Sequence, residues 1–335
     1  MANPAISVAM SVYNGERFLD AALESILAQT FGDFELLVVD DGSRDGTAAI
    51  LKTWAERDTR VRPIIRENRG LVASLNELLD RARAPLVARM DADDWCHPER
   101  FARQLAFLNA NPAYGVVGTW TEDMDEDGAE LTRQYPDHPL THEAMLGAIP
   151  RKGPLICHPS AMYRRDVVLS VGGYHAAFRH CEDLDLWLRL ASVTRLGNIA
   201  ERLLRYRRYE DQVSSRHSTE QQINAAISRL AWQEREAGRP DPTAALSRLP
   251  QIDALDAMFA RPGLARQVRA DVAPALVHSS HAMRGAGFDL LLDHLREGGS
   301  PPGMWRTVAR LMRFGEPARA LRLAATLAGR RIAGA

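Results

Sequence analysis

Acidic side chains end two of the strands that the sequence predicts. Asp40 and Asp41 close one apolar run, and Asp91 and Asp93 close another. If both runs are parallel strands, their carboxyl ends meet in the crevice where open α/β sheets bind ligands. Carboxylate oxygens there suit Mg²⁺ or Mn²⁺, with coordination positions left for phosphate oxygens. Taken singly, each cluster is equally typical of a turn or a helix cap, since Asp favours both.

The elements that would position these acids alternate between strand and helix. Apolar runs typical of strands lie at 6–12, 34–39, 61–65, 86–90 and 116–121, with helical spacing at 16–29, 45–57, 71–82 and 98–109. Strands joined by helices predict right-handed crossovers and a mostly parallel sheet flanked by helices. Further along, the sequence predicts a strand at 160–164, a helix at 182–192 and an antiparallel edge strand at 203–209.

The pattern changes near residue 218, where a long helical, Ala-, Leu- and Arg-rich segment begins. We therefore predict an α/β domain at 1–217, with halves of about 1–121 and 122–217. An all-helical C-terminal extension at 218–335 follows it.

Composition narrows the class of protein. The chain has 335 residues, 46% of them hydrophobic, and its net charge of -1 comes from 42 basic and 43 acidic residues. That balance argues against a nucleic-acid binder. Three scattered cysteines indicate a reducing compartment. The N-terminus lacks the features of a signal peptide and no apolar run is long enough to span a membrane, so we expect a cytoplasmic protein.

The absence of two phosphate-binding glycine motifs argues against two further classes of nucleotide-binding protein. The sequence has no Walker loop and no G-x-G-x-x-G after the first predicted strand. A P-loop NTPase and a standard dinucleotide dehydrogenase therefore both lose support.

Five ordered motifs resemble the family 2 glycosyltransferases over about residues 4–215. They are Ser11–Glu16, Val38–Ser43, Asn68–Gly70, Met90–Asp94, and Gly172–Tyr174 followed by Glu182–Arg189. The resemblance implies the GT-A fold, a Rossmann-like sheet that binds a nucleotide sugar. In that fold the first half of the domain would hold the nucleotide sugar and the second half the acceptor.

The resemblance also implies roles for individual residues. Nucleotide contacts would come from Tyr13, Asn14, Glu16, Ser43, Asn68 and Gly70, with Asp40 or Asp41 reading the base. Asp91 would face the ribose or the donor sugar, and Asp93 would hold Mn²⁺ or Mg²⁺ on the diphosphate. Asp183 falls at the position of the general base, although an acid there could also serve as a helix cap.

Lesser candidates carry two interpretations each. Glu182 belongs to the acceptor-side motif but is also typical of a first helical turn. His158 could touch the diphosphate or acceptor, or be a structural hydrogen-bonding partner. Trp187 follows Asp183 by one helical turn, so it could stack on a sugar ring or belong to the core.

One departure from the family pattern concerns the metal shell. Many relatives carry Tyr-Arg-x-His, whereas this chain has Tyr206-Arg207-Arg208-Tyr209, followed by Gln212-Val213-Ser214. A histidine ligand is therefore in doubt, with His217 nearby but displaced. Arg207 and its neighbours could contact diphosphate, since arginine binds two phosphate oxygens. They could also be solvated charges on an edge strand.

The C-terminal segment at 302–332 is predicted to form basic amphipathic helices. Seven arginines and one acid, Glu316, lie between residues 301 and 335. The sequence predicts Arg306, Arg310 and Arg313 on one face, opposite Trp305, Val308 and Met312. Such helices bind anionic membranes. They could instead pack on the catalytic domain or on a second subunit of a homo-oligomer.

Together these observations predict a metal-dependent, inverting glycosyltransferase of the hexosyl or N-acetylhexosaminyl type. Its expected donor is a UDP-sugar, and its expected acceptor is a hydroxyl of a glycan or lipid-linked molecule in bacterial surface polysaccharide or glycoconjugate synthesis. We expect it in the cytoplasm, with contact to the inner face of the membrane as one option. The alternatives are a nucleotidyltransferase and a non-catalytic subunit that binds nucleotide sugars.

Overall fold

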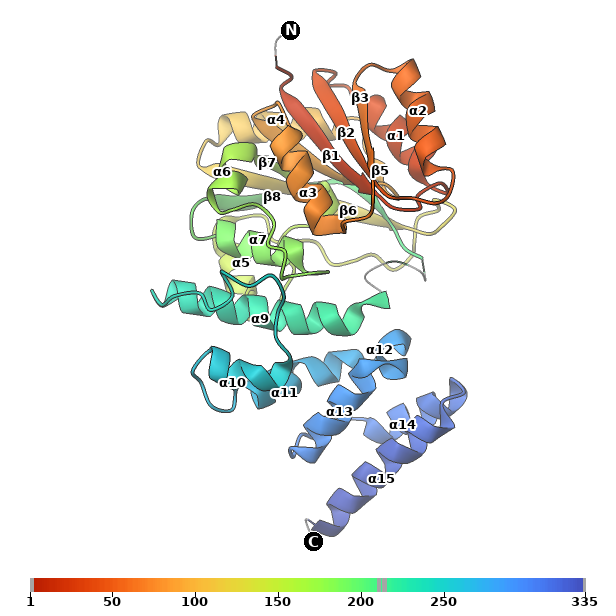
Figure 1. Cartoon of the computed structure of the whole chain (residues 1–335), viewed down its shortest axis with the longest axis vertical. Coiled ribbons are helices and arrows are strands. Elements are labelled where there is room, and N and C mark those ends of the chain that lie inside the picture. The colour runs from red at the N-terminus through yellow and green to blue at the C-terminus, as the bar shows by residue number, and fades with distance from the viewer. Residues whose placement is uncertain (1–2, 210–211, 213–215, 334–335) are drawn as a thin grey trace. The chain divides into compact units, whose positions relative to one another are not determined.

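The computed structural model describes residues 3–209, 212 and 216–333. They form two compact units, which are described separately (Figure 1). The sheet unit comprises residues up to 176 together with 182–209, and the helical unit comprises 177–181 together with the described residues after 209. The division at 209 falls a few residues before the boundary predicted at 217, and the helical unit also takes the short segment before Glu182.

One mixed sheet of eight strands organises the sheet unit, in the order β3-β2-β1-β4-β7-β6-β8-β5. Its first half is parallel and consists of β1 (Ile6–Val12), β2 (Phe34–Asp41), β3 (Val61–Arg66) and β4 (Leu86–Asp91). The remaining strands are β5 (Trp95–Cys96), β6 (Tyr114–Met124), β7 (Met162–Arg164) and β8 (Arg195–Arg207). The short β7 runs antiparallel to both β4 and β6, so it joins the two halves.

The prediction of an antiparallel edge strand at 203–209 is wrong. β8 begins at Arg195 and runs parallel to β6 over most of its length. It does not form the edge, because the two-residue strand β5 pairs antiparallel with it through Trp95 and Arg205. A strand as short as β5 leaves no alternating pattern from which the sequence could predict it.

Helices join the strands and pack against the sheet. They are α1 (Leu19–Leu27), α2 (Thr47–Arg57), α3 (Leu71–Arg81), α4 (Arg100–Ala110), α5 (His142–Ala148), α6 (Arg165–Ser170) and α7 (Glu182–Leu190). The apolar faces of α1 and α4 meet the parallel strands in one core, in which Leu23, Val38 and Phe101 are fully buried. The α/β prediction, with a mostly parallel first half, is confirmed.

The register of the parallel strands brings the two acid clusters together. β1 lies between β2 and β4, with Val12 opposite Asp40 on one side and Ser11 opposite Asp91 on the other. Because these partners are adjacent along β1, the two acid-bearing strands end at the same level of the sheet. The crevice that the sequence predicted is therefore where β1, β2 and β4 end.

The helical unit contains α9 (Ser218–Glu236), α10 (Leu255–Met258), α11 (Leu264–Leu276), α12 (Ser280–Arg284), α13 (Ala286–Arg296), α14 (Met304–Arg313) and α15 (Pro317–Ala333). Two apolar clusters hold it together. One lies around Ile227 and Val268, and the other around Phe288, Leu311 and Leu323. None of its described helices is long and apolar enough to cross a membrane.

Candidate active site

The loops that follow β1 and β2 are fastened to each other by polar side chains. The backbone N–H of Asn14 donates to Ser43 Oγ at 2.8 Å, and Asn14 Oδ1 accepts from the Arg44 N–H at 2.8 Å. The Glu16 carboxylate accepts from the Gly46 N–H at 2.8 Å. Tyr13, in contrast, is 52% exposed. The sequence-predicted nucleotide residues are thus brought together, with three of them shaping the loops and Tyr13 facing solvent.

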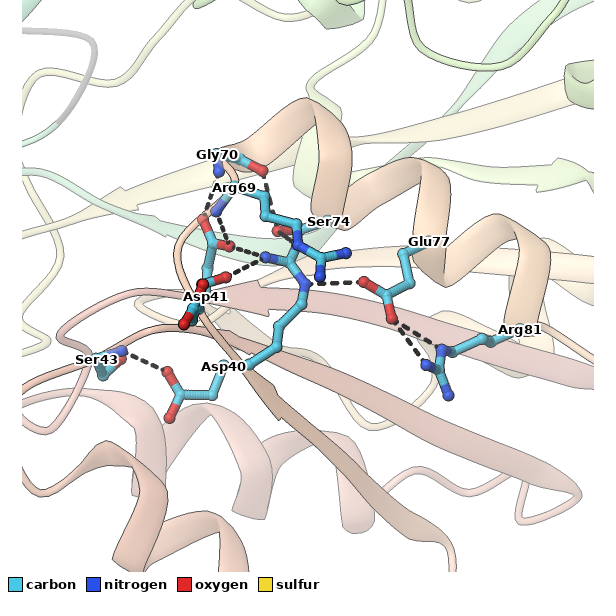
Figure 2. A network of polar contacts seen from close by, with 10 residues as sticks. Asp40, Asp41, Ser43, Arg69, Gly70, Ser74, Glu77 and Arg81 are labelled. Carbon is cyan, nitrogen blue, oxygen red and sulfur yellow. Dashed lines mark hydrogen bonds and ion pairs between the residues drawn. The ribbon is translucent and has the colours of Figure 1, made fainter.

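Asp41 organises the neighbouring loop (Figure 2). Its carboxylate accepts from the backbone N–H groups of Arg69 and Gly70, both at 2.9 Å, and forms an ion pair with Arg66. Arg66 also binds Glu77 at 2.8 Å, so two carboxylates oppose one buried guanidinium. Gly70 has φ of +87°, a conformation that favours glycine. These contacts position the loop at 67–70, which includes Asn68.

Asp40 has a different environment, although it is adjacent in sequence. It is 1% exposed, and one of its oxygens accepts from the Ser43 N–H at 2.9 Å (Figure 2). Among the described residues, none donates to its second oxygen. Of the two aspartates, Asp40 therefore keeps an acceptor for a ligand, whereas both oxygens of Asp41 are occupied.

Three carboxylates gather where β4 ends. Oxygens of Asp91, Asp93 and Asp94 lie within 4.8 Å of one another. Asp94 is 1% exposed; one oxygen accepts from the Arg207 N–H at 2.9 Å, and the other has no hydrogen-bond partner among the described residues. Burial and the neighbouring Asp91 charge raise the pKa of Asp93 to about 6. Burial, followed by the charges of Asp93 and Asp91, also raises the pKa of Asp94 well above its usual range.

The donor set of this cluster fits a hard divalent cation. Several carboxylate oxygens in close proximity repel one another, and a buried oxygen without a partner is costly. Mg²⁺ and Mn²⁺ prefer such oxygen ligands. The Tyr209 hydroxyl donates to the Asp93 carboxylate at 2.9 Å. No histidine joins the described cluster; His217 lies instead beside His180 and Glu220 in the helical unit.

A buried arginine lies beneath these acids. Arg89, on β4, has a side chain that is 2% exposed and forms an ion pair with Asp91. Its positive charge also lowers the pKa of Glu182 and Asp183 against the larger effect of burial, which raises both. Arg89 thus connects the cluster at the end of β4 to the first turn of α7.

Glu182 and Asp183 have different surroundings, although they are adjacent in the first turn of α7. Burial, followed by the charge of Asp183, raises the pKa of Glu182 to about 8, and one of its oxygens has no partner among the described residues. Burial also raises the pKa of Asp183, but its carboxylate accepts from the Leu184 N–H at 2.7 Å, which opposes the shift. Asp185 instead pairs with Arg189 at 2.8 Å. At neutral pH, Asp183 is therefore the better candidate for a base.

His158 and Trp187 are buried beside each other. His158 Nε2 lies 2.9 Å from the Tyr174 hydroxyl, and burial holds the pKa of this imidazole well below its usual range. Trp187 is 1% exposed and meets the His158 ring edge-on, with 6.0 Å between centroids. These contacts support the structural interpretations of both residues, because neither side chain is presented to a sugar ring.

Arg207 is not a solvated edge charge, since it is only 6% exposed. Its guanidinium donates to the carbonyl oxygens of Asp93 at 2.7 Å and Glu126 at 2.6 Å. A diphosphate would have to displace these contacts. Arg207 therefore connects β8 to the turn after β4, which contains Asp93, and to the loop after β6, which contains Glu126. Of the segment that follows, Val213 and Ser214 lie outside the described residues.

Arg89, Arg66 and the Tyr209–Asp93 contact were not predicted from the sequence. Arg89 had a detectable signal, because it interrupts the apolar run of β4, where a charge must be buried with a partner. Tyr209 had a signal too, since the family resemblance puts it at the position of a possible histidine of the metal shell. Arg66 had none, because its partner Asp41 lies 25 residues away along the chain.

Comparison with known proteins identifies the family. The model of glycosyl transferase family 2 matches residues 7–172. EpsE of Bacillus subtilis is 37% identical over 229 residues, which cover 67% of this chain and 80% of EpsE. The O-antigen biosynthesis glycosyltransferase WbnJ of Escherichia coli is 34% identical over 207 residues, or 60% and 79% of the two chains. The chain belongs to glycosyltransferase family 2.

Solved structures agree on the fold. Staphylococcus aureus TarS in complex with UDP-GlcNAc has a TM-score of 0.56 at 16% identity, over 97% of this chain and 91% of that one. The Pyrobaculum calidifontis mannosyltransferase PcManGT, in complex with GDP-Man and Mn²⁺, has a TM-score of 0.52 at 18% identity, over 97% and 87%. The predicted GT-A fold with a C-terminal helical region is confirmed, and the chain is a glycosyltransferase.

The two adjacent aspartates should differ in their effect on stability. Asp41→Asn removes half of the charge that opposes buried Arg66, so we expect a loss of about 3 kcal/mol in the free energy of unfolding. Asp40→Asn keeps an oxygen for the Ser43 N–H and should cost less than about 1 kcal/mol. Urea denaturation of both variants measures the difference, and equal losses would contradict the role assigned to Asp41.

Glu182→Gln should stabilise the protein in a pH-dependent way. Because the folded pKa of Glu182, about 8, exceeds its ordinary value of 4.5, ionisation of this group opposes folding as pH rises between those values. The advantage of Glu182→Gln over wild type should therefore grow by about 1 kcal/mol per pH unit across that window. Urea denaturation at several pH values measures it. A difference that stays constant across this window would contradict the buried environment.

Proposed function

We propose that this glycosyltransferase is metal-dependent and inverts the anomeric centre of the transferred sugar. The observation that carries the proposal is the carboxylate cluster of Asp91, Asp93 and Asp94, electrostatically linked through Arg89 to Asp183. A cation site and a candidate base thus occur together within the sheet unit. In an inverting transfer, the cation can stabilise the diphosphate leaving group while the base takes the proton of the acceptor hydroxyl.

The donor half of the site would be built around the ends of β1 and β2. The free oxygen of Asp40 can accept a ring N–H of a nucleobase such as uracil, while Asp41 holds the loop that includes Asn68 and Gly70. Exposed Tyr13 would border the base or the ribose. UDP-GlcNAc is bound in TarS and GDP-Man in PcManGT, and both bases present such N–H donors. Our proposed donor is a UDP-sugar.

Asp93, with Asp91 or Asp94, would hold Mn²⁺ or Mg²⁺. When bound, the cation would neutralise the negative charge that develops on the diphosphate leaving group. Tyr209 would orient Asp93 through its 2.9 Å hydrogen bond. Arg89, through its ion pair with Asp91, would hold that carboxylate in place.

Asp183 would act as the general base. Its carboxylate takes the proton of the acceptor hydroxyl while that oxygen forms a bond to the anomeric carbon. The bond from this carbon to the diphosphate oxygen breaks, and the leaving group retains the electron pair. A single displacement inverts the anomeric centre, so no second nucleophilic carboxylate is needed. Glu182, with a pKa of about 8, would remain protonated at neutral pH and would not compete for the proton.

The acceptor is proposed from the relatives. WbnJ is named for O-antigen biosynthesis, which makes a hydroxyl of a growing glycan or lipid-linked saccharide the acceptor class we favour here. The corresponding pathway would build a surface polysaccharide or glycoconjugate. Transfer would then take place on the cytoplasmic side of the membrane.

Release of nucleoside diphosphate from UDP-, GDP- and dTDP-sugars tests the proposal. We expect slow hydrolysis of one donor with Mn²⁺ or Mg²⁺ and none with EDTA. Asp93→Ala should abolish it. Asp183→Asn should bind the donor like wild type but transfer about 10²–10⁴-fold more slowly once an acceptor is supplied.

Exposed Asp166→Asn provides a matched control that should behave like wild type in both assays. Turnover that persists in EDTA and in Asp93→Ala would contradict the metal role. Full transfer by Asp183→Asn would contradict its role as base. Donor binding without turnover for any acceptor would favour a nucleotide-sugar-binding subunit.

A further inference from the structure

Helix α14 presents two large apolar side chains to solvent. Trp305 is 49% exposed and Met312 is 55% exposed. Met312 comes seven positions after Trp305, which is about two helical turns, so both lie on one side of the helix. Arg306 follows Trp305 directly, Arg313 follows Met312 directly, and both arginines are exposed. The packed side consists instead of Met304, Thr307 and Leu311. The sequence interpretation that Trp305 and Met312 belong to a packed apolar face of the helix is therefore wrong, because Met304, Thr307 and Leu311 take the packed positions.

Helix α15 and the turn before it also expose large apolar side chains. Leu321 is 70% exposed, whereas the adjacent Leu323 is fully buried. Phe314, at the end of α14, is 43% exposed. Arg322 is exposed beside Leu321 and pairs with Asp289 at 3.2 Å, and Ala325, Ala328 and Gly329 are also exposed among the residues of the helix whose burial is described. Since α14 and α15 contact each other, these side chains form part of one helical hairpin.

The hairpin is almost free of negative charge. Between residues 301 and 335 there are seven arginines and a single acid, Glu316. That acid is already opposed by Arg319 at 2.7 Å and by Arg284 at 3.7 Å. Exposed Arg306 and Arg313 lie along the helix next to the strip of Trp305 and Met312, so basic and apolar side chains adjoin each other on the outward half of α14.

We infer that the hairpin of α14 and α15 docks on an anionic lipid surface. Arginines would meet the negative headgroups while Trp305, Met312 and Leu321 enter the boundary of the acyl region, as in other interfacial helices. Charge complementarity favours lipid over a second copy of the chain. A two-fold contact through this face would bring the same arginines against one another, and like charges oppose association.

The inference does not depend on the proposed chemistry. An enzyme that uses a lipid-linked acceptor would gain local concentration from such docking, but the hairpin would bind lipid whatever the acceptor is. Binding and transfer can therefore succeed or fail separately.

Co-sedimentation of the full chain with vesicles tests the inference. With about 30% phosphatidylglycerol in phosphatidylcholine, we expect binding at least about tenfold stronger than to phosphatidylcholine alone, and weaker at high salt. Trp305→Ser/Met312→Ser should lose this binding, and Arg306→Gln/Arg313→Gln should weaken it about tenfold or more. All four positions are exposed, so the urea midpoint of each variant should remain that of wild type.

A matched control replaces exposed apolar residues of the sheet unit. Leu169→Ser/Val193→Ser should bind vesicles like wild type, since those positions lie outside the hairpin. Equal binding to both vesicle types, or anionic binding that survives both hairpin variants, would overturn the inference. A concentration-dependent dimer that disappears in Trp305→Ser/Met312→Ser would assign the surface to a second copy instead.

Discussion

The crowding of buried carboxylates at the end of β4 and in the first turn of α7 is the constraint on which the site depends. The carboxylates there belong to Asp91, Asp93, Asp94, Glu182 and Asp183, and one buried arginine, Arg89, acts on all of them. One guanidinium cannot balance several ionised groups in a low-dielectric setting. Part of the charge is relieved by protonation, as the raised pKa of Glu182 indicates. The remainder, at the end of β4, is what we propose a divalent cation would neutralise.

The surrounding structure serves to hold these groups in place. Parallel pairing of β1 with β2 and β4 fixes Asp40 and Asp91 at one level. Arg207, in β8, donates to the backbone carbonyl of Asp93, and the hydroxyl of Tyr209, just after β8, donates to the Asp93 carboxylate. Asp41 and Arg66 give the loop after β3 its shape without facing a ligand. Much of the polar network is therefore devoted to positioning.

Local patterns predicted the first half of the fold well. The parallel strands are short apolar runs with helical spacing between them, and acids mark their ends, so both Asp clusters could be assigned to one crevice. The order of strands in the second half depends on long-range pairing, and β5 is too short to leave a pattern. Arg89 leaves a signal in the sequence, because it is the one charge inside the apolar run Leu86–Met90. The exposure of Trp305 depended on which face of α14 the hairpin buries, which helical periodicity alone does not decide.

Binding of Mn²⁺ tests the central claim most directly. A calorimetric titration of the full chain with Mn²⁺, in the presence of UDP, should show that one ion binds per chain. Asp93→Asn should abolish that binding, whereas Asp166→Asn should leave it unchanged. UDP that binds equally well with and without EDTA, together with no Mn²⁺ uptake by the wild-type chain, would contradict the assignment of the β4 carboxylates to a metal.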